Sequence, residues 1–83
     1  MKKYLVDVYL PTIDKHYDVY LPTGKRIAEA TILLVALAQS LSSGSYVGAK
    51  KPMLLNADTG EPLKTDETVC DAGIRNSSKL ILI

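Results

Sequence analysis

The 83-residue chain carries ten Lys and Arg against nine Asp and Glu, a net charge of only +1. That balance provides no electrostatic attraction toward nucleic acid or an anionic membrane, so we expect neither as a partner. The single cysteine excludes an internal disulfide. The longest apolar run, 30–38, is far shorter than the roughly 20 residues that cross a bilayer. The first residues lack the apolar core of a signal peptide. We therefore expect one cytoplasmic domain over residues 1–83.

Two alternating segments at the start of the chain predict a β-hairpin. In Tyr4–Leu10 and Tyr17–Leu21, apolar side chains recur at every second position, which is the period of a half-buried strand. Pro11 ends the first segment, and the polar stretch 12–16 predicts the turn between the two strands.

The period then changes to that of a helix over residues 25–41. Thr23 is predicted to be the N-cap, because its hydroxyl can accept a hydrogen bond from a free amide of the first turn. Ser42, Ser43 and Gly44 predict the end of the helix. The residues predicted to form its buried face are Ile27, Ala30, Leu34, Leu37 and Leu41, with Thr31 and Ala38 beside them.

The remaining segments predict further short strands. Met53–Asn56 is the third strand, and residues 58–60 form a turn in which glycine supplies a positive φ. Residues 61–63 are at best a brief edge strand, since Pro62 cannot donate to a central ladder. Lys79–Ile83 is the final strand, and its unbroken apolar run indicates a central position in the sheet.

The order of these elements predicts an α+β fold. If the first and last strands lie side by side in mid-sheet, one helix packed across one face buries both of them. That arrangement is the β-grasp, with a mixed sheet of four to five strands.

Two motifs, TGEPL at 59–63 and ETVCDAGIRNSSKLIL at 67–82, carry a resemblance to a known family. The C-terminal half is similar to ubiquitin and, more closely, to the YukD-like ubiquitin-like proteins of type VII (ESX, WXG-motif) secretion systems in Gram-positive bacteria. Ser77 stands where that family commonly has glycine, and Ser78 stands where an acidic residue is common.

The resemblance implies a non-covalent adaptor or regulatory component of such a secretion system. Its partners would be cytoplasmic domains of membrane components, such as the FtsK/SpoIIIE-type ATPase, which would recruit it to the inner face of the membrane. A ubiquitin-like binding module unrelated to secretion is the alternative.

The corner between 67 and 74 is predicted to be structural. We expect Asp71 to cap the turn that begins there. Gly73 is expected to adopt a left-handed conformation, which alanine would resist. Ile74 is expected to enter the core.

The C-terminal residues argue against covalent conjugation, which requires a flexible tail ending in two glycines. Here Ile83 closes an apolar strand. Extracting Leu80 and Leu82 would cost roughly 1.5–3 kcal/mol for each buried side chain. We therefore expect neither a modifier nor a sulfur carrier, with a product of a longer precursor as the remaining alternative.

We expect no enzyme, cofactor or metal site. His16, the one histidine, is predicted to be a solvated turn residue beside Asp14 and Lys15. Cys70 has no evident partner that would activate it as a nucleophile, and is predicted to be a buried or half-buried apolar side chain. Metal-ligand spacings and phosphate- or dinucleotide-binding motifs do not occur in the sequence.

Two surfaces are predicted to bind protein. On the open face of the sheet, alternation of side chains predicts an aliphatic patch, which the resemblance to ubiquitin also supports. The alternative is an apolar sheet face that lysine side chains partly shield from solvent. The back of the helix is unusually apolar, so it is predicted to be covered by the loop 42–52, by a second copy in a homo-oligomer, or by another protein. The sheet-face residues are Leu5, Leu54, Ile81 and Ile83, and the helix-back residues are Ala28, Ile32, Val35 and Ala36.

Overall fold

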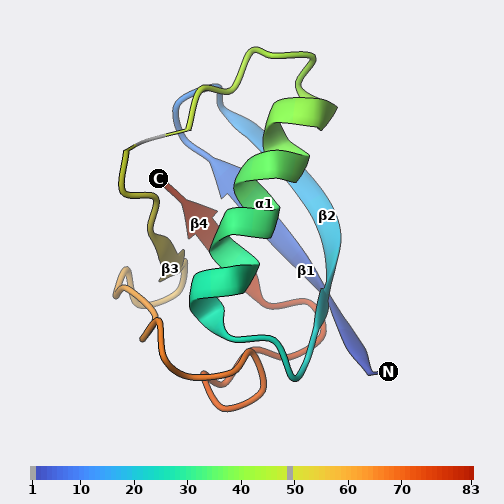
Figure 1. The fold of residues 1–83 in the computed structure, drawn as a ribbon, viewed down its shortest axis with the longest axis vertical. Helices are drawn as coiled ribbons and strands as arrows, with labels where there is room; N and C mark the ends of the chain where they lie inside the picture. The colour runs from blue at the N-terminus through green and yellow to red at the C-terminus, as the bar shows by residue number, and fades with distance from the viewer. Residues whose placement is uncertain (1, 49) are drawn as a thin grey trace.

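One helix lies across one face of a four-stranded mixed sheet in the computed structural model, which describes residues 2–48 and 50–83 (Figure 1). The sheet order is β2-β1-β4-β3. This is the β-grasp, so the predicted α+β fold class is confirmed. The elements in chain order are β1 (Lys3–Leu10), β2 (Lys15–Pro22), α1 (Ile27–Leu41), β3 (Leu54–Asn56) and β4 (Lys79–Leu82).

The first and last strands lie side by side in the middle of the sheet, as predicted. β4 pairs parallel to β1, with Val8 opposite Leu80, and pairs antiparallel to β3. Leu80 and Leu82 are almost fully buried on the helix side. The antiparallel pairing continues past the strand ends, because Ile83 and Met53 exchange both of their backbone hydrogen bonds at 3.0 Å.

The fourth predicted segment, 61–63, forms only an isolated bridge between Pro62 and Leu55. The neighbouring amides of Asn56 and Leu63 donate to Glu61 and Leu54, each at 2.9 Å. Pro62 lies between these two hydrogen bonds with its ring nitrogen directed away from β3, so this edge offers no amide at that position.

The buried face of α1 follows the predicted spacing except at Leu37, which is half-buried, and at the end of the helix. Ile27, Ala30, Thr31, Leu34 and Ala38 are buried. Leu41 was predicted to join them and is instead 52% exposed. The last turn of α1 lies beside the edge strand β2, where a groove of about 390 Å³ opens between the two elements. No described segment fills that groove, so the side chain at the end of the helix stays in contact with solvent.

The start of α1 is capped by a distant segment and not by Thr23, so that prediction is wrong. The N-cap residue is Arg26, whose side chain makes no capping hydrogen bond. The amides of Ile27 and Ala28 donate instead to the carbonyls of Glu67 and Thr65, at 2.8 and 3.1 Å. Two free amides of the first helical turn therefore receive their acceptors from the loop before β4.

That loop carries the corner motif, which is structural as predicted. Val69 and Ile74 are buried, and Gly73 has a φ of +85°. The proposed cap is wrong, however, because the hydroxyl of Thr68 accepts the hydrogen bond from the Asp71 amide at 3.1 Å, and Asp71 itself is exposed. A threonine three residues earlier can reach this amide, so the carboxylate is not needed for the turn.

The segment after α1 packs back against the helix. Tyr46 is 3% exposed, and its amide donates to the Ser42 hydroxyl at 2.9 Å. A Cβ at Gly48 would lie only 2.9 Å from Cγ1 of Val35. Burial raises the pKa of the Tyr46 phenol. Among the described residues, no hydrogen-bond partner reaches its hydroxyl.

Replacing Tyr46 with phenylalanine should stabilise the protein. The variant loses no described hydrogen bond and removes a buried hydroxyl whose desolvation is not compensated, a penalty of about 1–3 kcal/mol. Urea denaturation should show a higher free energy of unfolding for Tyr46→Phe, while Tyr20→Phe, at a 62% exposed position, should leave it unchanged. A loss of stability in Tyr46→Phe would show that the hydroxyl has a partner.

Ser77 offers a second stabilising change. Its φ is +70°, in the left-handed region that disfavours residues with a side chain. This accounts for the glycine that is common at this position in the YukD-like family. Ser77→Gly should raise the free energy of unfolding by up to about 1 kcal/mol, the gain being partly offset by a more flexible unfolded chain.

The matched control is Ser78→Gly, since the Ser78 hydroxyl accepts a hydrogen bond from the Arg75 amide at 2.8 Å. That variant should lose stability in the same thermal or urea denaturation. Equal effects at both positions would contradict the role assigned to the positive φ.

Candidate partner-binding surfaces

The sheet face opposite α1 is not covered by any element of the described chain. Strand side chains alternate, so residues next to buried ones point to this open face. The cross-strand register brings Leu5 opposite Tyr20, Tyr9 opposite both His16 and Ile81, and Ile81 opposite Leu55. Residues of the four strands on the open face include Leu5, Asp7, Tyr9, His16, Asp18, Tyr20, Leu55 and Ile81.

An aliphatic patch lies at the β3–β4 side of the open face. We define it as Met53, Leu55, Ile81 and Ile83. Leu55 and Ile81 are directly opposite in the ladder, and the hydrogen-bonded pair of Met53 and Ile83 continues it with the same side-chain direction. Met53 and Ile83 are each 42% exposed, and the other two side chains are half-buried. Contiguous exposed apolar side chains of this kind are typical of protein-binding surfaces.

The prediction for Leu54 is wrong, because this residue is 2% exposed and belongs to the core. It pairs with Leu82, and both side chains point toward α1. Leu55 takes the outward position. The run Met53-Leu54-Leu55 is apolar at every residue, so the sequence holds no signal for which leucine faces inward, and a one-residue change of register exchanges the faces.

The other predicted sheet-face residues lie where the alternation placed them. Leu5 is 37% exposed on the open face. It is separated from the aliphatic patch, because its cross-strand neighbour is Tyr20 and its amide bonds the Asn76 side chain at 3.0 Å. Met53 and Leu55 were missed by sequence reasoning and join Ile81 and Ile83.

A polar cluster occupies the β1–β2 side of the open face. His16 lies in β2 and not in the preceding turn, which corrects the prediction. Its Nδ1 is 3.1 Å from Asp7 Oδ2, and its ring stacks on Tyr9 with centroids 4.5 Å apart. The Tyr9 hydroxyl donates to Asp14 at 2.8 Å, and this hydrogen bond raises the pKa of the Tyr9 phenol. The imidazole is 61% exposed, so this pair is a solvated surface interaction of small energetic weight.

Asp7 and Asp18 form a like-charged cross-strand pair in the same cluster. They lie directly opposite in the β1–β2 ladder. Asp7 has His16 beside it and Lys79 opposite it on β4. Within the described residues, Asp18 makes no salt bridge. Like charges directly opposite each other disfavour the pairing, so a cation near Asp18 would be stabilising.

Cys70 is exposed, which contradicts its predicted burial. Its sulfur lies 4.0 Å from the Tyr4 hydroxyl at the edge of the structural corner. The corner places Val69 inward, so the adjacent side chain points to solvent. Across residues 2–48 and 50–83, no three His, Cys, Asp or Glu side chains gather closely enough to hold a metal ion.

The back of α1 is apolar and largely open. Ile32 is 68% exposed, and Ala28 and Ala36 are exposed beside it. Val35 is half-buried, because the segment around Gly48 covers it. The loop after α1 therefore covers one of the four predicted helix-back residues.

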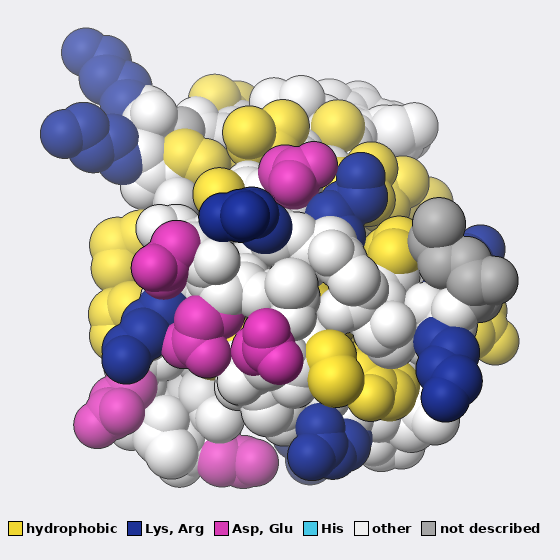
Figure 2. Space-filling view, turned by 60° about the horizontal axis from the view of Figure 1, so that its bottom comes forward, with side chains coloured by type: hydrophobic (Ala, Val, Ile, Leu, Met, Phe, Trp, Pro, Cys, Tyr) yellow, Lys and Arg dark blue, Asp and Glu magenta, His cyan; other side chains and the backbone are white. Residues whose placement is uncertain are grey.

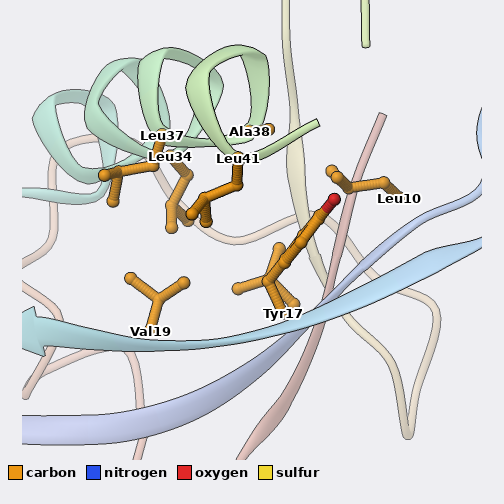
Figure 3. A pocket seen from close by; sticks show the side chains of 8 residues that line it. Leu10, Tyr17, Val19, Leu34, Leu37, Ala38 and Leu41 are labelled. Atoms are coloured by element: carbon orange, nitrogen blue, oxygen red, sulfur yellow. The ribbon is translucent and has the colours of Figure 1, made fainter. Parts of the chain in front are cut away.

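The apolar gap between α1 and the hairpin strands β1 and β2 is too small for a ligand. Leu34, Leu37 and Leu41 project from the helix toward Tyr17 and Val19 of β2 (Figure 3). The volume enclosed is about 10 Å³, about one water molecule at most, and its lining is apolar.

Charges are mixed at the loop end of the molecule. Figure 2 shows Lys and Arg side chains interspersed with Asp and Glu there, with apolar side chains between them. This face carries no uniform basic surface of the kind that tracks phosphates. No helix in the described chain has the length and hydrophobicity needed to span a membrane.

Comparison with solved structures identifies relatives of the fold. The ubiquitin-like domain of the type VII secretion protein EccD1 of Mycobacterium tuberculosis matches with a TM-score of 0.79 and 21% identity, over 100% of this chain and 99% of that chain. The EccD5 ubiquitin-like domain of Mycobacterium xenopi matches at 0.74 and 17%, over 100% and 94%. A chain of the ESX-5 inner membrane complex matches at 0.83 and 15%, over 100% of this chain and 21% of that chain. No protein-family model and no curated protein sequence matches.

The chain is therefore a ubiquitin-like β-grasp domain. In structure it matches the EccD ubiquitin-like domains of type VII secretion systems, so the YukD-like resemblance of its C-terminal motifs is confirmed at the level of the fold.

The register that separates core from patch can be tested at two adjacent leucines. Leu54→Ala should lower the free energy of unfolding by about 2–5 kcal/mol, because it opens a cavity in the core. Leu55→Ala should cost less than half of that, since the Leu55 side chain is only half-buried. Urea denaturation of both variants measures the difference. Equal losses would contradict the β3–β4 register.

Proposed function

We propose that this protein is a non-covalent protein-binding component of a type VII secretion system, acting as an adaptor or regulator through the aliphatic patch. The observation that carries the proposal is the patch itself: four aliphatic side chains from two paired segments, on a sheet face that the fold leaves open. The helix side of the same strands forms the core, so the patch is not needed to bury the helix.

The secretion context is supported by two similarities. The motifs at 59–63 and 67–82 resemble the YukD-like family. The fold matches ubiquitin-like domains of two EccD proteins, and also matches about a fifth of a chain in an ESX-5 inner membrane complex. We infer that the partners are cytoplasmic domains of membrane components of that apparatus, with the FtsK/SpoIIIE-type ATPase as the first candidate. The protein would then work on the cytoplasmic side and be recruited to the membrane by them.

Aliphatic recognition is consistent with the low net charge of the chain. With a formal charge of +1, long-range electrostatic steering contributes little to association. Affinity would come from desolvating the patch, at about 25 cal/mol for each Å² of apolar surface that the partner covers. A charge placed in the centre of such a surface is costly to bury, so a single substitution should abolish binding.

Ile81→Asp is the variant that tests the proposal. Immobilised wild-type chain should recover type VII membrane components, including the ATPase, from a lysate of the organism that carries the gene. Ile81→Asp should lose them, because it places a carboxylate in the middle of the patch. Mass spectrometry of the bound fraction measures both results.

The matched control is Ile32→Glu, which adds a charge on the opposite side of the molecule. It should retain the same bound proteins. Equal recovery by wild type and Ile81→Asp would remove the aliphatic patch from consideration, and loss in Ile32→Glu alone would assign binding to the back of α1. Partners that depend on Ile81 but include no secretion component would identify a binding module of another assembly.

A further inference from the structure

β2 is an edge strand whose outer backbone groups are available for pairing. It is eight residues long and, among the strands of the described residues, pairs with β1 alone. Figure 1 shows it along one margin of the sheet, at the opposite side from β3. A long exposed edge presents unpaired amides and carbonyls to any strand that approaches.

The hydrogen bonds around β1 decide which groups face outward. The Thr23 amide donates to the Lys2 carbonyl at 3.0 Å, so residues 2 and 23 form a hydrogen-bonded pair. Hydrogen-bonded pairs alternate with non-hydrogen-bonded pairs along an antiparallel ladder, so every second pair of β1 and β2 residues after this one is hydrogen-bonded. The pairs between them, including Asp7 with Asp18 and Tyr9 with His16, are not. Consistently, the Asp7 amide donates away from β2, to Ser78 at 2.9 Å. The backbone groups of His16, Asp18 and Tyr20 therefore point out of the edge.

No described segment satisfies these groups. Among residues 2–48 and 50–83, no backbone hydrogen bond joins His16, Asp18 or Tyr20 to a segment outside the hairpin. Asp18 also lacks a counter-charge and lies opposite Asp7. A strand that pairs with this edge would be favoured if it set a cationic or hydrogen-bond-donating side chain against Asp18.

β2 itself supplies that side chain. When two copies of β2 pair antiparallel about a two-fold axis at Tyr17, His16 of each copy lies opposite Asp18 of the other. Each of the two His16–Asp18 pairs then forms two backbone hydrogen bonds between the copies, which gives four hydrogen bonds in total. Shifting the register by two residues would instead set Asp18 against Asp18, which like-charge repulsion disfavours.

The helix side of the edge is compatible with the same pairing. Side chains of β2 on that side include the half-buried Tyr17 and Val19. The groove of about 390 Å³ beside them is lined by the apolar side chains of Ile13, Tyr17 and Leu41, together with Lys15 and three serines. In the two-fold arrangement, Tyr17 of the second copy lies across from Tyr17 and beside this groove.

We propose that the β2 edge is a self-association site, at which a second copy of this chain pairs antiparallel through reciprocal His16–Asp18 contacts. The contact joins the two sheets into one continuous eight-stranded sheet with both aliphatic patches left open. The site lies at the opposite margin of the sheet from the patch and does not depend on the proposed secretion partners.

Sedimentation equilibrium of the purified chain, from micromolar to millimolar concentration, measures the self-association directly. Wild type should convert reversibly to a dimer, and the backbone amide NMR signals of His16 and Asp18 should shift with concentration. Asp18→Pro should remain a monomer with an unchanged circular dichroism spectrum, because the amide that it removes points outward and is not part of the β1–β2 ladder.

Charge exchange tests the register without altering the backbone. Asp18→Lys should weaken dimerisation by about tenfold, since each of the two cross-strand pairs loses the carboxylate that accepts from His16. The same change removes the repulsion from Asp7, so the monomer should unfold at a higher urea concentration. The double variant His16→Asp with Asp18→Lys places opposite charges across the interface and should recover the dimer.

Ile32→Glu is the control, because the back of α1 is the competing surface for self-association. It should leave the dimer intact. A wild type that stays monomeric at millimolar concentration, or a dimer that persists in Asp18→Pro and breaks in Ile32→Glu, would overturn the proposal. Neither outcome bears on recovery of secretion components through Ile81, which is measured separately.

Discussion

The parallel pairing of β4 with β1 is the constraint on which the rest of the structure depends. It joins the two ends of the chain in the centre of the sheet, with Val8 opposite Leu80. The buried side chains of both strands then form the apolar surface of the sheet against which α1 packs. The loop that leads into β4 also supplies the carbonyls of Thr65 and Glu67 that cap the start of α1. Displacing β4 would therefore remove a central strand. It would also release the preceding loop, whose carbonyls accept hydrogen bonds from the first turn of α1.

The same pairing creates the candidate binding surface. In a strand, burial of alternate side chains forces the others to the opposite face. Because Leu80 and Leu82 enter the core, Ile81 and Ile83 point outward, and β3 brings Leu55 and Met53 beside them. Core and patch are thus two faces of one ladder. A substitution on the outward face can change binding with a small effect on stability, which makes the patch a practical target.

The two margins of the sheet differ for local chemical reasons. The β3 margin is short and is closed by the bridge to Pro62, which has no amide to offer. The β2 margin is long, and its outward backbone groups meet no other described segment. It also carries Asp18 against Asp7, an electrostatic cost that the hairpin alone does not relieve. The molecule therefore has one closed margin and one open margin, with the aliphatic patch next to the closed one.

Periodicity in the sequence was sufficient to predict the hairpin, the helix, the central final strand and the β-grasp, because each element buries a face and burial imposes a repeat of two or about 3.6 residues. It also placed Leu5, Ile81 and Ile83 on the open face. Tertiary structure alone decided the rest. Leu54 and Leu55 are chemically identical neighbours, so only the pairing with β4 distinguishes the core residue from the surface residue. The cap of α1 comes from residues about forty positions away, and the His16–Asp7 contact joins two strands. Local pattern determines which faces are apolar, whereas contacts between distant segments determine what each face meets.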